Sequence, residues 1–168
     1  MKAQDLRALQ APLKQRYKDD PGTAVVTLRA SGTIDGSGVS CRVETGRALV
    51  EAGLHPATGG SGLQACSGDM LLEALAACAG VTLRAVATAL EIPILGGTVH
   101  VEGDLDFRGT LGVSKEAPVG FQSIRLHLEV DSNASQDQLD TLLKLTERYC
   151  VVLQTLRSST SVTAGLSS

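Results

Sequence analysis

The feature of this sequence that most limits its fold is the segment Asp69–Leu90, which is apolar almost throughout. Its charged side chains are Asp69, Glu73 and Arg84, and the rest is dense in leucine and alanine, which are strong helix formers. A helix that is apolar nearly all round must be buried on nearly all sides. We therefore predict a core helix that begins at the cap signal Ser67-Gly68-Asp69.

The same segment is too polar at its ends and too rich in alanine to indicate a membrane span. No window of the chain reaches the roughly 18 apolar residues that a span requires. The N-terminal residues 1–20 carry charge throughout and lack the apolar stretch of a signal peptide. We therefore expect no membrane association and a cytoplasmic location, where thiols are normally kept reduced.

A second helix is predicted from Ser135 to about Leu156. Ser135 and Gln138 form a capping-box pattern, which marks the start of a helix. Because eleven residues of helix make about three full turns, Cys150 lies on the same face as Leu139 and points into the core. The same arithmetic gives the first helix one stripe that contains Leu71, Leu75, Cys78 and Thr82.

Strict alternation of polar and apolar residues predicts two half-buried strands, at 98–105 and 123–130, joined by a loop with Gly and Pro. Two further strands, Ala24–Ala30 and Val39–Glu44, flank a turn-prone stretch and indicate a hairpin. The order β-β-α-β-β-α indicates an α+β fold in which helices pack on antiparallel sheets. Residues 1–22 are expected to form an N-terminal arm or helix, and residues 23–168 the main domain.

Composition excludes one class of partner. Only 2% of the 168 residues are aromatic, so the chain has little to offer as a stacking platform for bases. The net charge of −3 supplies no basic field for a phosphate backbone. We therefore expect no nucleic acid partner.

The four cysteines, at positions 41, 66, 78 and 150, form no CxxC pair of the kind found in zinc sites, so we expect no structural zinc. Cys78 and Cys150 each lie on the inward face of a predicted helix. One interpretation is that they are small apolar filler, since free cysteine is among the most buried residue types. The other is a reactive pair, in which one thiolate is oxidised to a sulfenic acid and the second thiol condenses with it.

The residues around these cysteines resemble a known family. Met70–Cys78 reads MLLEALAAC after a Gly-rich loop, and Glu147–Val152 reads ERYCVV. These stretches are similar to the two cysteine motifs of the OsmC/Ohr family, a helix with LLxALxxC and a later helix with YCPV. The resemblance in element order and motif placement covers roughly residues 23–165.

The resemblance implies an intertwined homodimer in which antiparallel sheets of both subunits wrap around two long buried helices. It implies a peroxidase that reduces organic hydroperoxides without a metal or other cofactor. Cys78 would be the peroxidatic nucleophile, Cys150 the resolving thiol, and an external dithiol would complete turnover. A thiolate needs a nearby cation or helix end to lower its pKa, and an apolar surround suits an organic hydroperoxide.

The sequence also departs from the family pattern. Characterised members carry Pro-Glu before the leucines, and the Glu holds an arginine that contacts the reactive sulfur; here those positions are Ser67 and Gly68. Asp69 either takes over the carboxylate role or is an ordinary acid at a helix start. For the arginine, Arg29 and Arg42 are the candidates, and each is equally consistent with a solvated strand residue.

Three further positions leave alternatives open. Val151 replaces the proline after the second cysteine, Cys66 either competes with Cys150 as resolving thiol or is a spectator, and Cys41 is interpreted as filler. His100 and His127 lie on the polar faces of two strands, which favours a solvated sheet face over a shared site. The departures keep a second hypothesis open, a non-peroxidase member with unactivated cysteines that binds a small molecule or is associated with stress.

Overall fold

The computed structural model describes residues 3–34, 41–43 and 52–166, without the side chains of residues 3–7, 28–34 and 41–43. In chain order the elements are α1 Ala3–Asp19, the 3-10 turn η1 Pro21–Ala24, β1 Val25–Ile34, β2 Cys41–Val43, the 3-10 turn η2 Pro56–Thr58, α2 Ser67–Ala89, β3 Gly96–Asp106, α3 Phe107–Thr110, β4 Phe121–Asp131, α4 Gln136–Tyr149 and α5 Val151–Arg157.

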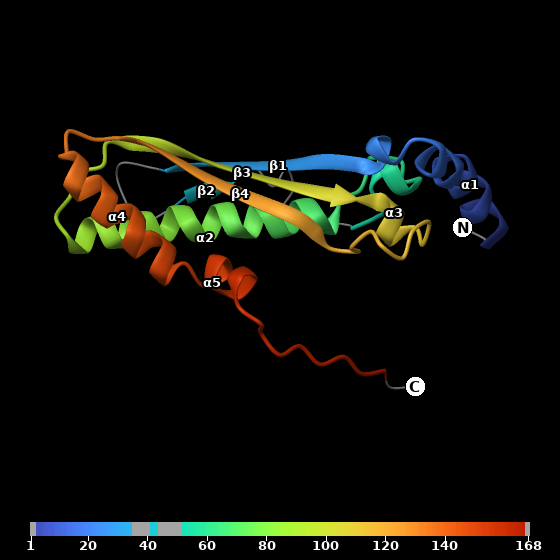
Figure 1. The fold of residues 1–168 in the computed structure, drawn as a ribbon. Helices are drawn as coiled ribbons and strands as arrows, with labels where there is room; N and C mark the ends of the chain where they lie inside the picture. The colour runs from blue at the N-terminus through green and yellow to red at the C-terminus, as the bar shows by residue number, and fades with distance from the viewer. Residues whose placement is uncertain (1–2, 35–40, 44–51, 167–168) are drawn as a thin grey trace.

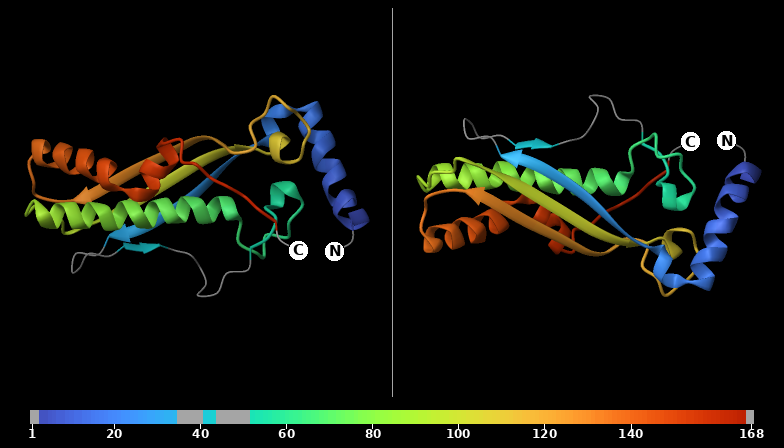
Figure 2. Two further views of the ribbon diagram at one scale, coloured as in Figure 1. Left: turned by 90° about the horizontal axis from the view of Figure 1, so that it is seen from below. Right: turned by 90° about the horizontal axis from the view of Figure 1, so that it is seen from above.

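The strands form one antiparallel sheet in the order β2-β1-β3-β4, and α2, α4 and α5 all lie on one of its faces (Figures 1 and 2). Alternation along β3 decides which side chains meet the helices, because successive residues of a strand point to opposite faces. Val99 and Val101 are fully buried, whereas His100 between them is exposed. The predicted α+β fold with an antiparallel sheet is confirmed.

Helix α2 supplies the centre of the core. Its buried residues, among them Leu72, Leu75 and Leu83, pack with the inner side chains of β3 and with α4. Fully burying each leucine stabilises the fold by about 1.5–3 kcal/mol. Within this one chain the burial is one-sided, because Leu71 and Val81 on the remaining surface of α2 are exposed.

The start of α2 differs from the prediction. The N-cap is Cys66, which has an extended backbone and makes no side-chain cap hydrogen bond, so Ser67 is already inside the helix. The helix also meets the length and composition of a membrane span, with a mean hydropathy of 1.6 over 18 residues, although Glu73 and Arg84 interrupt its apolar run. A single such helix is weak evidence for a membrane, since core helices meet the same criterion.

The second predicted helix is two helices. The capping box at Ser135 is confirmed, because the Ser135 backbone N–H donates to Gln138 Oε1 at 3.0 Å and the Gln138 backbone N–H donates back to the Ser135 hydroxyl. The prediction of one helix to Leu156 is wrong, because Cys150 has an extended backbone that ends α4 and begins α5. Two β-branched residues, Val151 and Val152, follow the break, and they lower the helix propensity of this segment.

The N-terminal helix packs at the far end of the molecule from the α4–β4 connection (Figure 1). The Tyr17 hydroxyl donates to the Ala57 carbonyl at 2.8 Å, and Tyr17 forms a small second core with Ala24, Phe107 and Leu111. Pro12 lies inside α1. The division of the chain at residue 22 stays a prediction.

Candidate functional site: a pair of thiols

The fold brings Cys78 and Cys150 together. Cys78 lies in the middle of α2 and is half-buried, whereas Cys150 is fully buried at the break between α4 and α5. Both are free thiols, and their side chains hydrogen-bond to each other. Both belong to the apolar cluster that α2 forms with the sheet, as the helical periodicity predicts.

The break in the second helix explains the hydrogen bonds to Cys78. The first N–H groups of a helix have no acceptor within it, so those of Val151 and Val152 are free to donate elsewhere. Both donate to the Cys78 sulfur, as do the side chains of Thr82 and Cys150. Burial raises the pKa of Cys78, but these four hydrogen bonds outweigh it, so the pKa of Cys78 is below its ordinary value.

The pKa of Cys150 is shifted the other way, to about 11. Burial is the main cause, and the neighbouring Cys78 adds to it, because a charge on Cys78 disfavours a second negative charge. The pair therefore has a defined order of ionisation. The Cys78 thiol is the first of the two to lose its proton, and the Cys150 thiol keeps its proton to higher pH.

Asp69 and Cys78 are not brought together within the chain. They are nine residues apart on α2, which is about 13 Å along the axis and half a turn round it. Asp69 is half-buried; burial raises its pKa, while the charge of nearby His55 opposes the rise. The carboxylate role of Asp69 stays a prediction.

The two candidate arginines lie in the first two strands. Arg29 stands opposite Glu102 in the register of β1 and β3, and Arg42 stands opposite Thr33. Their side chains lie outside the described residues. The role of Arg29 as the activating cation therefore stays a prediction.

Cys66 is too distant to resolve Cys78. Twelve residues of α2 separate them, which is about 18 Å along the helix axis. A disulfide needs Cα atoms within about 7 Å of each other. The alternative in which Cys66 competes with Cys150 is therefore incompatible with an intact α2. Cys41 lies in β2, and its side chain is outside the described residues.

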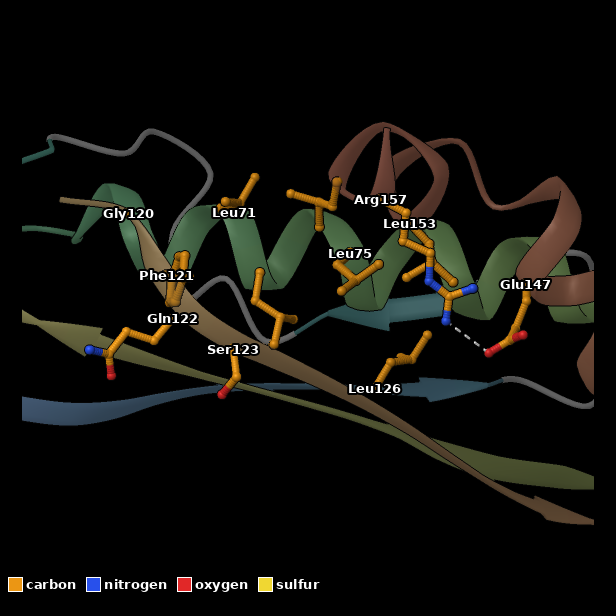
Figure 3. Close-up of a pocket in the computed structure, with 12 residues that line it drawn as sticks. Leu71, Leu75, Gly120, Phe121, Gln122, Ser123, Leu126, Glu147, Leu153 and Arg157 are labelled. Carbon is orange, nitrogen blue, oxygen red and sulfur yellow. Dashed lines mark hydrogen bonds and ion pairs between the residues drawn. The ribbon is translucent and has the colours of Figure 1, made fainter. Parts of the chain in front are cut away.

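A cavity of about 530 Å³ lies between α2, α5 and β4, and neither Cys78 nor Cys150 is among the residues that line it (Figure 3). Leu75 and Leu153, each three residues from one of the two cysteines, line it together with the apolar side chains of β4. Arg157 on α5 also lines it and donates to Glu147 at 3.1 Å. Sequence spacing does not single out this arginine, because only the bend at Cys150 turns α5 towards the cavity.

Comparison with known proteins identifies the family. A family model described as OsmC-like protein matches residues 60–165, which include α2 to α5 and both cysteines. The chain belongs to the OsmC-like protein family. The predicted resemblance is thus confirmed.

Two solved OsmC-like structures share the fold. An OsmC-like hydroperoxide resistance protein from Jannaschia sp. CCS1 superposes with a TM-score of 0.61 at 17% identity, covering 86% of this chain and 95% of that one. An OsmC-like protein from Mycoplasma pneumoniae gives a TM-score of 0.56 at 18% identity, covering 80% and 86%.

A curated protein also matches, the 3-phosphoshikimate 1-carboxyvinyltransferase of Methanocorpusculum labreanum, at 31% identity over 162 residues. The match covers 94% of this chain but 35% of that protein. The OsmC-like chain therefore spans about a third of the length of this relative.

The histidines of this OsmC-like chain lie away from the thiols. His100 and His127 face each other across β3 and β4, and each Nε2 lies within 4 Å of the Glu129 carboxylate, at 3.9 and 3.6 Å. Both rings are well exposed, as expected for a solvated sheet face. Among the described residues no group of three or more His, Cys, Asp or Glu side chains is arranged to hold a metal ion.

Proposed function

We propose that the protein is a thiol peroxidase that reduces organic hydroperoxides through Cys78 and Cys150. The observation that carries this proposal is the contact between two free thiols whose pKa values are shifted in opposite directions. A pair used only as apolar filler needs no donors on one sulfur. Here two backbone N–H groups and a threonine donate to Cys78, which is the arrangement that a nucleophilic thiolate requires.

The chemistry takes two steps. The Cys78 thiolate attacks the terminal oxygen of a hydroperoxide ROOH; the S–O bond forms, the O–O bond breaks, and the released RO⁻ takes a proton from water to leave as ROH. The Cys150 thiol then attacks the sulfenic sulfur, and a Cys78–Cys150 disulfide and water are formed. An external dithiol supplies the two electrons that restore the thiols.

The cavity between α2, α5 and β4, which residues one turn from each cysteine help to line, supports an organic substrate. Its walls are mainly leucine, isoleucine and phenylalanine side chains from α2, β4 and α5. Such walls favour an alkyl or aryl group over hydrogen peroxide, because burial of apolar surface contributes to binding. The Jannaschia protein is named for hydroperoxide resistance, which agrees with this substrate class.

We further propose that the protein is a homodimer in the cytoplasm. Apolar side chains remain exposed on the surface formed by α2, α4 and α5, which is where a second subunit would enclose the helices. This surface contains Met70, Leu71, Val81, Leu143, Val151 and Leu156. Large exposed apolar side chains on one set of helices are typical of a surface that another chain covers.

The direct test is consumption of cumene hydroperoxide by the purified protein with a dithiol reductant. Cys78→Ser is expected to lower turnover to the uncatalysed rate, because serine at this position is not ionised at neutral pH. Cys66→Ser is the matched control, since it removes a thiol next to the start of the same helix, about 18 Å away, and should retain full activity. Equal background rates for the wild type and Cys78→Ser would reject the peroxidase.

The second hypothesis, a small-molecule binding protein with unactivated cysteines, is favoured by Ser67 and Gly68 in place of Pro-Glu. The alkylation rate of Cys78 with iodoacetamide separates the two. A peroxidase requires Cys78 to react faster at neutral pH than a free cysteine. A rate no faster than that of free cysteine, together with no turnover, favours the binding protein.

A further inference from the structure

Two threonines accompany the two cysteines. Helices α2 and α4 run in opposite directions along the same face of the sheet (Figure 2). Thr82 is one turn after Cys78 on α2, and Thr146 is one turn before Cys150 on α4. Because the two helices are antiparallel, both threonines lie on the same side of the contact between the cysteines. Cys78, Thr82, Thr146 and Cys150 are thus a polar cluster within an apolar core.

The two hydroxyls are used differently. Thr82 donates to the Cys78 sulfur. Thr146 is 1% exposed, and among the described residues its hydroxyl has no hydrogen-bond partner. A threonine inside a helix usually donates to the carbonyl four residues earlier, and here it does not.

An unpaired hydroxyl at this position works against folding. Burying a hydroxyl without a partner is unfavourable, and valine has nearly the same shape without that penalty. The fold alone therefore favours valine at position 146. A threonine there indicates a partner that is absent from the reduced protein and forms during the reaction.

We propose that the Thr146 hydroxyl binds the oxygen atom that Cys78 acquires on oxidation, by donating a hydrogen bond to the sulfenic oxygen. This inference rests on the oxidation of Cys78 in the proposed function. The donors around the reduced Cys78 are directed at sulfur, so the new oxygen requires a donor of its own. Because Thr146 is fully enclosed, the organic part of a substrate is excluded from it. Its place one turn before Cys150, which contacts Cys78, makes an oxygen bonded to Cys78 the partner that we assign to it.

This hydrogen bond acts on the second step. When the Cys150 sulfur attacks Cys78, the S–O bond breaks and negative charge develops on the departing oxygen. The Cys150 thiol supplies the proton, so the oxygen leaves as water. A donor that strengthens as charge develops lowers the barrier of this step and leaves the first attack on the hydroperoxide unaffected.

The test separates the two steps in Thr146→Val and Thr146→Ser. Reduced protein is oxidised with cumene hydroperoxide or, in a parallel series, with hydrogen peroxide. Quenched samples are then analysed by mass spectrometry for two products. These are the Cys78 sulfenic acid, which is trapped with dimedone, and the disulfide. In Thr146→Val we expect disulfide formation to slow by on the order of tenfold, the change expected from one hydrogen bond to a charged oxygen. Thr146→Ser, which keeps the hydroxyl, should form the disulfide within about twofold of the wild-type rate.

Three controls exclude a merely structural effect. In a Cys150→Ser background, Thr146→Val should leave the rate of sulfenic acid formation unchanged. Thr141→Val removes an exposed hydroxyl that donates to the Asp137 carbonyl on the same helix, and it should leave both steps unchanged. Urea unfolding should show Thr146→Val to be at least as stable as the wild type.

The inference is overturned if Thr146→Val forms the disulfide at the wild-type rate, if Thr146→Ser is as slow as Thr146→Val, or if neither oxidant converts Cys78 to its sulfenic acid. Failure of the proposed function looks different. In that case cumene hydroperoxide leaves the wild type unoxidised while hydrogen peroxide oxidises Cys78, and the hydrogen peroxide series still decides the role of Thr146.

Discussion

On the outer face of the sheet, Asp104 accepts hydrogen bonds from Thr27 at 2.6 Å, from Ser123 at 2.7 Å and from Arg125 at 3.0 Å. On the inner face, the polar side chains beside the thiols are the half-buried Thr82 and the buried Thr146, and the Thr146 hydroxyl has no partner among the described residues. A solvated polar group can hydrogen-bond to water or to a neighbour, whereas a buried polar group interacts more strongly with the groups beside it. The proposed reactive groups therefore lie on the face where buried polar groups act on one another.

Of the two faces, the inner one is expected to give the larger effect, from Thr82→Val. Removing this donor leaves the Cys78 thiolate with one hydrogen bond fewer, so the pKa of Cys78 should rise and its alkylation at neutral pH should slow by on the order of tenfold. The measurement is the iodoacetamide rate as a function of pH. Thr88→Val, which removes a hydroxyl that donates to the Arg84 carbonyl further along α2, is the control. An unchanged profile in Thr82→Val would mean that the hydrogen bond contributes nothing to thiolate stability.

A smaller effect is expected on the outer face, from Asp104→Asn. Hydrogen bonds from Arg125, Thr27 and Ser123 lower the pKa of Asp104 in the folded protein. Its contribution to stability is therefore present above the unfolded pKa of about 4, and is lost as the pH falls towards the folded value. Asp104→Asn should reduce stability at neutral pH and flatten its fall below pH 4.

Urea unfolding at several pH values measures this effect, with the exposed Asp131→Asn at the end of β4 as the control. If Asp104→Asn loses as much stability between pH 4 and pH 2 as the wild type does, the outer network does not stabilise the fold. Peroxide turnover at neutral pH should be the same in both variants, because neither residue contacts the thiols.

The two faces also show what periodicity predicts. Strict alternation predicts which side chains of β3 and β4 point to each face of the sheet, and the helical repeat predicts that Cys78 and Cys150 point inward. Both predictions depend only on the identity and spacing of side chains. Helical spacing would also have separated Asp69 and Cys66 from Cys78, since both distances are set by the rise per residue. These relations are local and need no knowledge of tertiary contacts.

Other parts of the site could not be predicted from the sequence. The donors from Val151 and Val152 are backbone N–H groups, and no residue type marks them. They are directed at Cys78 because the helix breaks at Cys150, whereas the LLKLTERYC pattern predicts one continuous helix. The orphan hydroxyl of Thr146 is likewise visible only once the packing of α4 on α2 is known.

The most direct test of the central claim is to treat the reduced wild type with one equivalent of cumene hydroperoxide and to map the disulfide by peptide mass spectrometry. We predict a single product that links Cys78 to Cys150 with the loss of two thiol hydrogens, and no such product in Cys150→Ser. A protein that stays fully reduced, or one in which Cys78 is linked to Cys66, would contradict the proposal that Cys78 and Cys150 are the working pair.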